Sequence, residues 1–106
     1  MGTLFYGAGR IPVIVEDVTL AHLKALVTSK QRRNEGLLVS WTDSQDVGSG
    51  RSSVWLHPMC DLHYKFEGSR PPQLDPAILE EMSREASQAR GVELSGATLA
   101  HPPARR

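Results

Sequence analysis

The chain has almost no cysteine and no long apolar run. Its 106 residues contain one cysteine, Cys60, which excludes an internal disulfide framework and favours a reducing compartment. The longest apolar runs have the length of strands, well short of a membrane span, and no signal-peptide pattern follows Met1. We therefore expect a cytoplasmic protein without a membrane partner.

The chain also lacks an excess of charge of either sign. Twelve basic and twelve acidic residues give a net charge of zero, which excludes a global attraction to nucleic acid or to anionic lipid. Any such attraction must come from a local patch of basic residues. Aromatic residues make up only 6% of the sequence, which limits the surfaces on which bases could stack.

The composition of the sequence is that of one small folded domain. Hydrophobic residues make up 40% and charged residues 23%, as in ordinary globular proteins. A chain of this length is close to the usual size of a single domain. We expect residues 1–94 to form this domain, and residues 95–106, which lack periodicity, to be a flexible C-terminal tail.

The N-terminal third carries the signals of a β-hairpin and a helix. Strand-like segments at residues 4–6 and 11–15 flank a turn that contains two glycines. Asp17 or Thr19 can cap the helix that follows, and Gly36 is a natural terminator. The apolar positions of this helix recur at helical spacing. They are Leu20, Leu23, Leu26 and Val27.

The middle of the chain predicts a second hairpin. Residues 37–42 and 53–57 are typical strands, separated by a polar, Gly-rich loop. One possible register makes Trp41 and Trp55 cross-strand neighbours, packed in the core or on a sheet face. Residues 62–67 alternate strictly between apolar and polar, and form either a further strand or the bent continuation of the previous one.

A second amphipathic helix follows. Asp75 before Pro76 is a strong helix start, and Gly91 is its expected end. Residues 92–94 could add a short strand. The order is strand, strand, helix, strand, strand, an optional strand and helix, joined by hairpins rather than crossovers. The sequence therefore predicts the α+β class, with a mainly antiparallel sheet of about five strands and both helices on one face.

The segment Lys65–Arg70, KFEGSR, is the local motif that most specifically suggests a chemical activity. It resembles the K-x-D-G-x-R element of ATP-dependent DNA ligases, in which the lysine attacks the α-phosphate of ATP. The resemblance implies catalytic roles for Lys65, Glu67 and Arg70, with ATP and Mg²⁺ as cofactors, although Glu67 replaces the usual Asp. No lysine follows Lys65 and only 36 residues follow Arg70, so this activity would require another chain.

Seven short segments spread along the chain form a wider pattern. They are Met1–Gly7, Ala21–Leu23, Lys30–Glu35, Ser40–Thr42, Gly48–Ser52, Val54–Pro58 and Gly68–Pro72. Over about residues 2–94 this pattern resembles a family of short actinobacterial proteins, many of which carry the name "ATP-dependent DNA ligase". The resemblance points to a family, and none of its segments is a catalytic signature.

A cluster of possible metal ligands lies between the later strands. His57, Cys60, Asp61 and His63 are residue types that bind transition metals. Their spacing matches no structural zinc pattern, and Cys60 has no partner in a C-x-x-C pair. We expect a hydrogen-bonded or exposed set of side chains, with no metal and no cofactor outside the ligase-like hypothesis.

Five basic residues are candidates for binding phosphate. They are Lys30, Arg32, Arg33, Arg51 and Arg70. The first three suit the negative end of the helix dipole, so a solvated helix terminus is the alternative interpretation. Arg51 and Arg70 each lie beside glycines whose backbone amides could approach a phosphate. If these residues converge, they form an anion or nucleic-acid site.

Three functional hypotheses follow from these patterns. The first is a non-catalytic accessory module that binds a phosphate-bearing partner, DNA above all, through the five basic residues. The second is adenylyl transfer at Lys65, with another chain completing the enzyme. The third is a protein-interaction module that uses an exposed sheet edge or the apolar face of the second helix.

Overall fold

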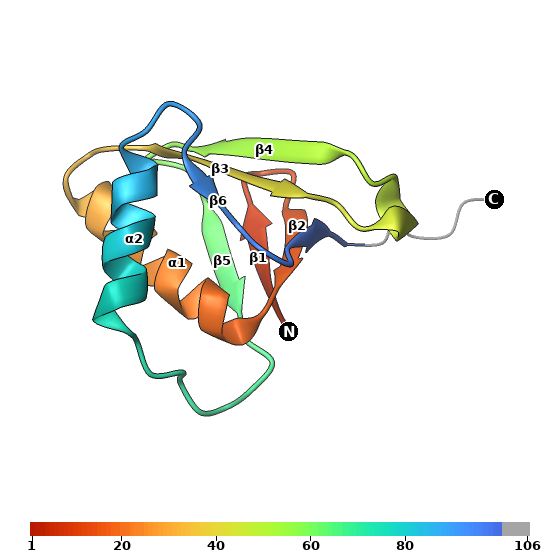
Figure 1. Ribbon diagram of the computed structural model, residues 1–106, viewed down its shortest axis with the longest axis horizontal. Helices are drawn as coiled ribbons and strands as arrows, with labels where there is room; N and C mark the ends of the chain where they lie inside the picture. Colours follow the sequence, from red (N-terminus) through yellow and green to blue (C-terminus); the bar gives the residue numbers. More distant parts are fainter. Residues whose placement is uncertain (101–106) are drawn as a thin grey trace.

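The computed structural model describes residues 1–100, which form two helices and seven strands (Figure 1). In chain order these elements are β1 (Gly2–Tyr6), β2 (Ile11–Val15), α1 (Asp17–Arg32), β3 (Leu37–Thr42), β4 (Arg51–Leu56), β5 (Leu62–Lys65), α2 (Pro76–Ala86), β6 (Val92–Glu93) and β7 (Thr98–Leu99). A short 3-10 helix, Gln45–Val47, lies in the loop between β3 and β4.

The strands form two sheets. One has the order β5-β1-β2-β7 and the other β4-β3-β6, and every pairing within residues 1–100 is antiparallel except that of β3 with β6. The α+β class and the mainly antiparallel pairing are confirmed, but the strands divide between two sheets where we expected one. The division arises because β5 pairs with β1, Thr3 lying opposite Lys65, instead of extending the β3–β4 hairpin.

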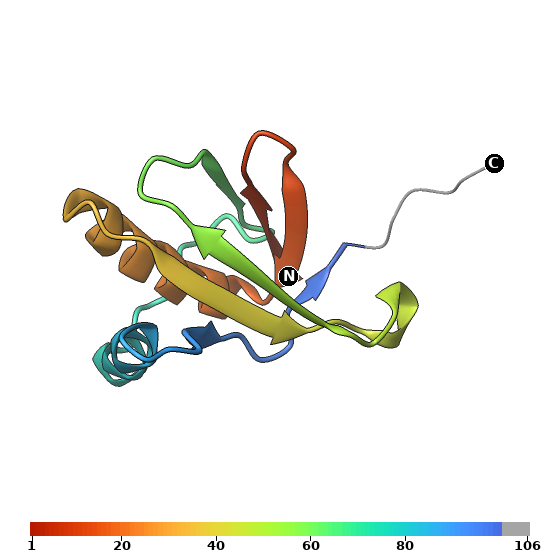
Figure 2. The same cartoon turned by 90° about the horizontal axis from the view of Figure 1, so that it is seen from above.

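Helix α1 buries one face in the core of the molecule. Figure 1 shows α2 in front of α1, and Figure 2 shows β3 and β4 running obliquely to β1 and β2. Leu20, Leu23 and Val27 are each 0% exposed, which confirms the predicted apolar stripe. Burying each of these side chains stabilises the fold by about 2 kcal/mol. The two helices pack against each other, and α2 also contacts β3 and β6 of the second sheet, whereas α1 contacts β1 of the first.

Helix α2 starts where the sequence predicts. The Asp75 carboxylate accepts a hydrogen bond from the Ala77 N–H at 2.9 Å, and Pro76 occupies the first turn. The helix ends at Ala86, earlier than expected. Only Met82 of its side chains is buried, and Ile78 is exposed.

The two tryptophans lie on opposite faces of their sheet. The register pairs Trp41 with Ser52 and Trp55 with Leu38, so they are not cross-strand neighbours. Trp41 is buried in the core, whereas Trp55 is 53% exposed.

The expected tail contains an ordered segment. Thr98 pairs with Ile14 and Leu99 with Val13, which adds β7 to the first sheet. Strand pairing in the described residues thus extends beyond residue 94. The remainder of the predicted tail, residues 101–106, lies outside the described residues.

Candidate anion-binding groove

A groove of about 710 Å³ runs along one side of α1. Its other wall is the connection between β5 and α2, residues 66–75, which we call the strap. The strap crosses below α1 at the bottom of Figure 1. A cavity of this size is in the range that holds a small ligand or part of a larger one.

Two side chains of α1 anchor the start and the end of the strap. The Asp17 carboxylate accepts hydrogen bonds from the backbone N–H groups of Glu67 at 3.2 Å and Gly68 at 2.9 Å. The bond from Gly68 is the main reason why the pKa of Asp17 lies below its ordinary value. Helix α1 therefore provides one wall of the groove and also determines the place where the other wall begins.

His22 holds the far end of the strap. Its imidazole is 1% exposed, and its Nε2 accepts the Asp75 N–H at 2.8 Å. Its Nδ1 lies 2.7 Å from the Val18 carbonyl oxygen, to which it donates, so the ring is the neutral Nδ1–H tautomer. No local sequence signal indicates this role, because His22 lies off the apolar stripe of the helix.

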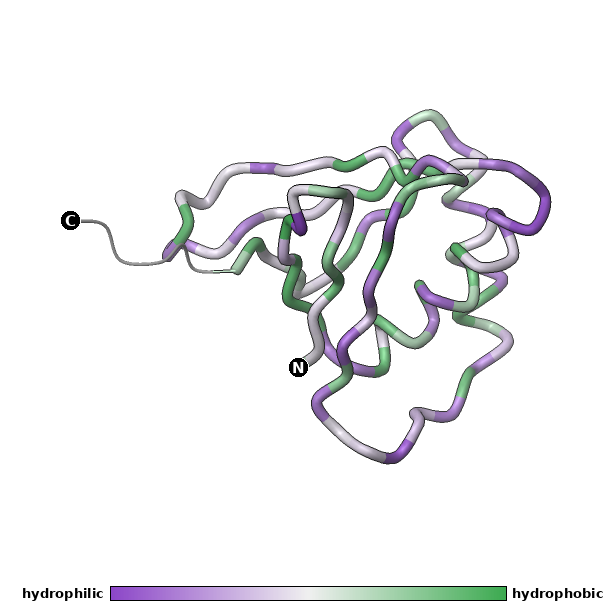
Figure 3. Tube along the Cα trace, turned by 180° about the vertical axis from the view of Figure 1, so that it is seen from behind, coloured by the Kyte–Doolittle hydropathy of each residue, from purple (hydrophilic) through white to green (hydrophobic). Residues whose placement is uncertain are grey.

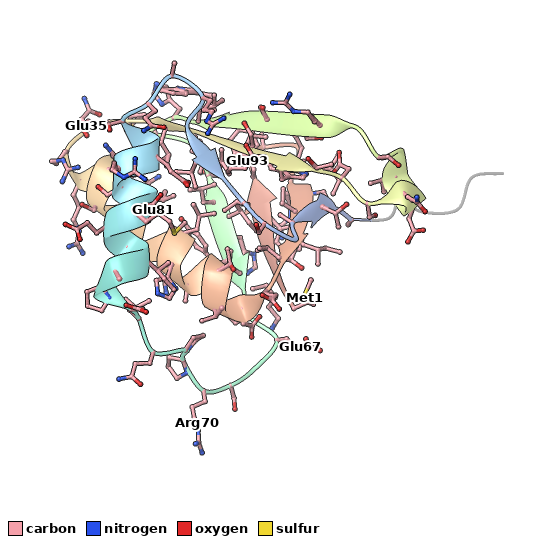
Figure 4. All side chains as sticks on the ribbon, viewed as in Figure 1. Met1, Glu35, Glu67, Arg70, Glu81 and Glu93 are labelled. Atoms are coloured by element: carbon pink, nitrogen blue, oxygen red, sulfur yellow. The ribbon has the colours of Figure 1, made fainter. Side chains whose placement is uncertain are left out.

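Four cations line the groove, and among residues 1–100 none of the lining residues is acidic. Lys24, Arg32 and Arg33 come from α1, and Arg70 comes from the strap. Arg32 and Arg70 form no ion pair with another residue in the range 1–100, whereas Arg33 reaches Glu35 at 3.5 Å. Figure 4 shows Arg70 at the tip of the strap, pointing away from the body of the molecule. A ligand with negative charge in the groove therefore meets positive charge mainly on the α1 wall, from Lys24, Arg32 and Arg33.

The remaining lining is small or apolar, with a few hydroxyl groups. The residues on α1 are Ala21, Ala25, Thr28 and Ser29, and those on the strap include Phe66, Ser69, Pro71, Pro72 and Leu74. The Lys24 ammonium lies 5.7 Å from the centre of the Phe66 ring, within cation–π range. The groove thus joins a cationic side to an apolar side.

Three of the five predicted phosphate-binding residues line this groove, namely Arg32, Arg33 and Arg70. Lys30 instead pairs with Glu35 at 3.4 Å. Arg51 lies at the start of β4 opposite Thr42 and is not among the lining residues. Figure 3 shows the hydrophilic run at the end of α1 to which Arg32 and Arg33 belong.

Lys24 was not among the predicted phosphate-binding residues. It precedes Thr28 by four residues and Arg32 by eight, which places all three on one stripe of a helix. That spacing is a usable signal in the sequence. It is easily overlooked beside the more conspicuous cluster of basic residues at the helix end.

The residues of the ligase-like motif do not meet in the groove. Lys65 is exposed at the end of β5 and is not among the lining residues. The Glu67 carboxylate lies 2.5 Å from the amino nitrogen of Met1, and only Arg70 of the three lines the groove. Within the described residues, the lining also contains no histidine, cysteine or carboxylate that could serve in acid–base chemistry. Adenylyl transfer at Lys65 stays a prediction from the motif.

The possible metal ligands are dispersed. Within residues 1–100, no three His, Cys, Asp or Glu side chains gather closely enough to hold a metal ion. His57 accepts a backbone N–H through Nδ1, and His63 contacts the Arg10 guanidinium at 3.3 Å. Cys60 is partly buried, and that burial raises the pKa of its thiol, which makes the thiolate scarce at neutral pH.

Comparisons with known proteins add a family but no activity. A family model described as a domain of unknown function (DUF7882) matches residues 1–97. The match includes α1 and the whole strap, so it spans the groove. Neither the curated proteins nor the solved structures contain a match to the chain. Neither helix in the described part of the chain is long and apolar enough to cross a membrane.

Proposed function

The chain belongs to the DUF7882 family of domains of unknown function, and we propose that it is a non-catalytic module that binds a phosphate-bearing partner, nucleic acid, in the groove. The observation that carries this proposal is the lining itself, which among residues 1–100 includes four cations, three of them on α1, and no carboxylate. Guanidinium groups match the geometry of phosphate oxygens and bind them with two hydrogen bonds.

The overall charge makes the groove the preferred place for a polyanion. Because the chain has a net charge of zero, its attraction for phosphates depends on where cations gather without acidic neighbours. Lys30 is a counterexample, since Glu35 neutralises it at 3.4 Å. Arg32 has no such partner within residues 1–100 and should contribute most to binding.

Replacing Arg32 and Arg33 together by Ala should weaken nucleic-acid binding about tenfold or more. Removal of each phosphate-binding cation should also reduce the steepness of log K against log salt by roughly 0.7 to 0.9. The measurement is fluorescence anisotropy of a labelled oligonucleotide at several salt concentrations.

A matched control removes the same charge elsewhere. Arg51 and Arg90 are both exposed and lie outside the groove lining, so the double Ala variant should keep the affinity and the salt slope of the parent protein. Equal losses in the two double variants would show that binding depends on total charge, and would contradict a site in the groove.

A further inference from the structure

Two of the groove cations, Lys24 and Arg32, lie in one row along the axis of α1. Lys24, Thr28 and Arg32 are spaced by four residues, so their side chains follow one another at steps of about 6 Å along the helix. Lys24 and Arg32 are therefore separated by about 12 Å along this axis. Such a row is too long for one phosphate group and fits successive phosphates of a chain.

The strap gives the groove an apolar side next to this row. Phe66 is half-buried and contributes to the lining together with Pro71 and Pro72. The Lys24 ammonium lies over the Phe66 ring, 5.7 Å from its centre, so a base that stacks on this face of the ring takes the place of the ammonium and leaves it free to pair with a phosphate. A nucleotide can use this combination, because its base can stack on an aromatic ring while its phosphate pairs with a cation.

The position of the strap determines which form of nucleic acid can enter. Asp17 and His22 hold its two ends against α1, so the strap flanks this side of the helix and obstructs its insertion into the major groove of a duplex. A duplex also keeps its bases paired and stacked inside. Only a strand with unpaired bases can place a base against Phe66 while its phosphates follow Lys24 and Arg32.

We propose that the partner bound in the groove is a single-stranded nucleic acid, with one base on the Phe66 side and its phosphates along the Lys24, Thr28 and Arg32 stripe. This inference rests on the proposed function and makes it more specific. The hydroxyl of Thr28, midway along the stripe, is a hydrogen-bond donor for a phosphate or sugar oxygen.

The test compares four probes in competition with a labelled oligothymidylate. They are the unlabelled strand, a duplex of the same sequence, inorganic polyphosphate and thymidine monophosphate. We expect the strand to bind about tenfold more tightly than any of the other three, because only it combines stacking with several phosphate contacts. A duplex that competes as well as the strand overturns the inference but leaves phosphate binding in place.

A Phe66→Leu variant tests the role of the ring, with Phe5→Leu as its control. Phe5 is half-buried on β1 and lies outside the groove lining. Phe66→Leu should weaken binding of the strand about tenfold and leave binding of polyphosphate unchanged, and Phe5→Leu should change neither. Circular dichroism confirms that both variants fold.

Three further outcomes distinguish single-strand binding from phosphate binding in general. In the first, polyphosphate competes as well as the strand and Phe66→Leu does not change binding of the strand. This result overturns base stacking on Phe66 but retains a phosphate-binding site in the groove. Thymidine monophosphate that binds as tightly as the strand overturns the row of phosphate contacts and points to a free nucleotide. Failure of all four probes to bind overturns both proposals.

Discussion

Gly91→Ala should lower the free energy of unfolding by about 4 kcal/mol, among the largest losses that one substitution causes. Gly91 has a φ of +73°, and a Cβ added to it would lie 2.3 Å from the backbone oxygen of Leu38. A backbone atom cannot rotate away as a side chain can. The clash therefore forces β6, which begins at the next residue, away from β3. Urea unfolding followed by circular dichroism measures the loss.

Gly96 provides a matched control for this prediction. It has the same φ of +73°, but within residues 1–100 no heavy atom lies within 4 Å of an added Cβ. Gly96→Ala therefore carries only the cost of the left-handed backbone, about 1 to 2 kcal/mol. Similar losses in the two variants would show that the contact with Leu38 relaxes, and would contradict the tight approach of β6 to β3.

Asp43→Ala should cost about 3 kcal/mol, because it leaves several buried donors without an acceptor. The Asp43 carboxylate accepts hydrogen bonds from Trp41 Nε1 at 2.7 Å, Ser52 Oγ at 2.5 Å and the Leu99 N–H at 2.8 Å. It thereby ties the β3–β4 hairpin to β7. Asp46, which is exposed in the same loop, is the control, and its Ala variant should change stability by less than about 0.5 kcal/mol.

The same carboxylate predicts how stability depends on pH. Burial alone raises the pKa of Asp43, but the hydrogen bonds from Leu99, Ser52 and Trp41 outweigh burial and hold this pKa below its ordinary value. The stabilisation is therefore complete above the unfolded-state pKa of about 4, and is lost as the pH falls through the lower folded-state pKa. The difference in free energy of unfolding between wild type and Asp43→Ala should therefore shrink as the pH falls. A difference that stays constant with pH would contradict the network.

The elements that the sequence predicted are those whose signals are local. The stripe that includes Leu23 places α1, and Asp75 before Pro76 marks the start of α2, because caps and helical spacing depend on neighbouring residues. The division into two sheets was not predictable in this way. It depends on the pairing of Lys65 with Thr3, which are 62 residues apart, and no periodicity encodes such a partner.

The candidate site was predicted in part for the same reason. Arg32 and Arg33 are adjacent in sequence and necessarily lie at one end of α1, so their grouping needed no tertiary information. Whether Arg51 lies near Arg32 and Arg33 depends on the position of β4 in the fold. Arg51 is at the start of β4 and is not among the residues that line the groove. The strap itself depends on His22, whose contact with Asp75 spans 53 residues.

The most direct test of the central claim is to map the binding surface by ¹H–¹⁵N NMR during titration with a single-stranded oligonucleotide. Binding in the groove predicts that the largest shift changes fall on α1 between residues 21 and 33 and on the strap, with Arg51 and the rest of β4 unaffected. Changes confined to the outer surfaces of the two sheets, or spread evenly over exposed basic residues, would contradict a binding site between α1 and the strap.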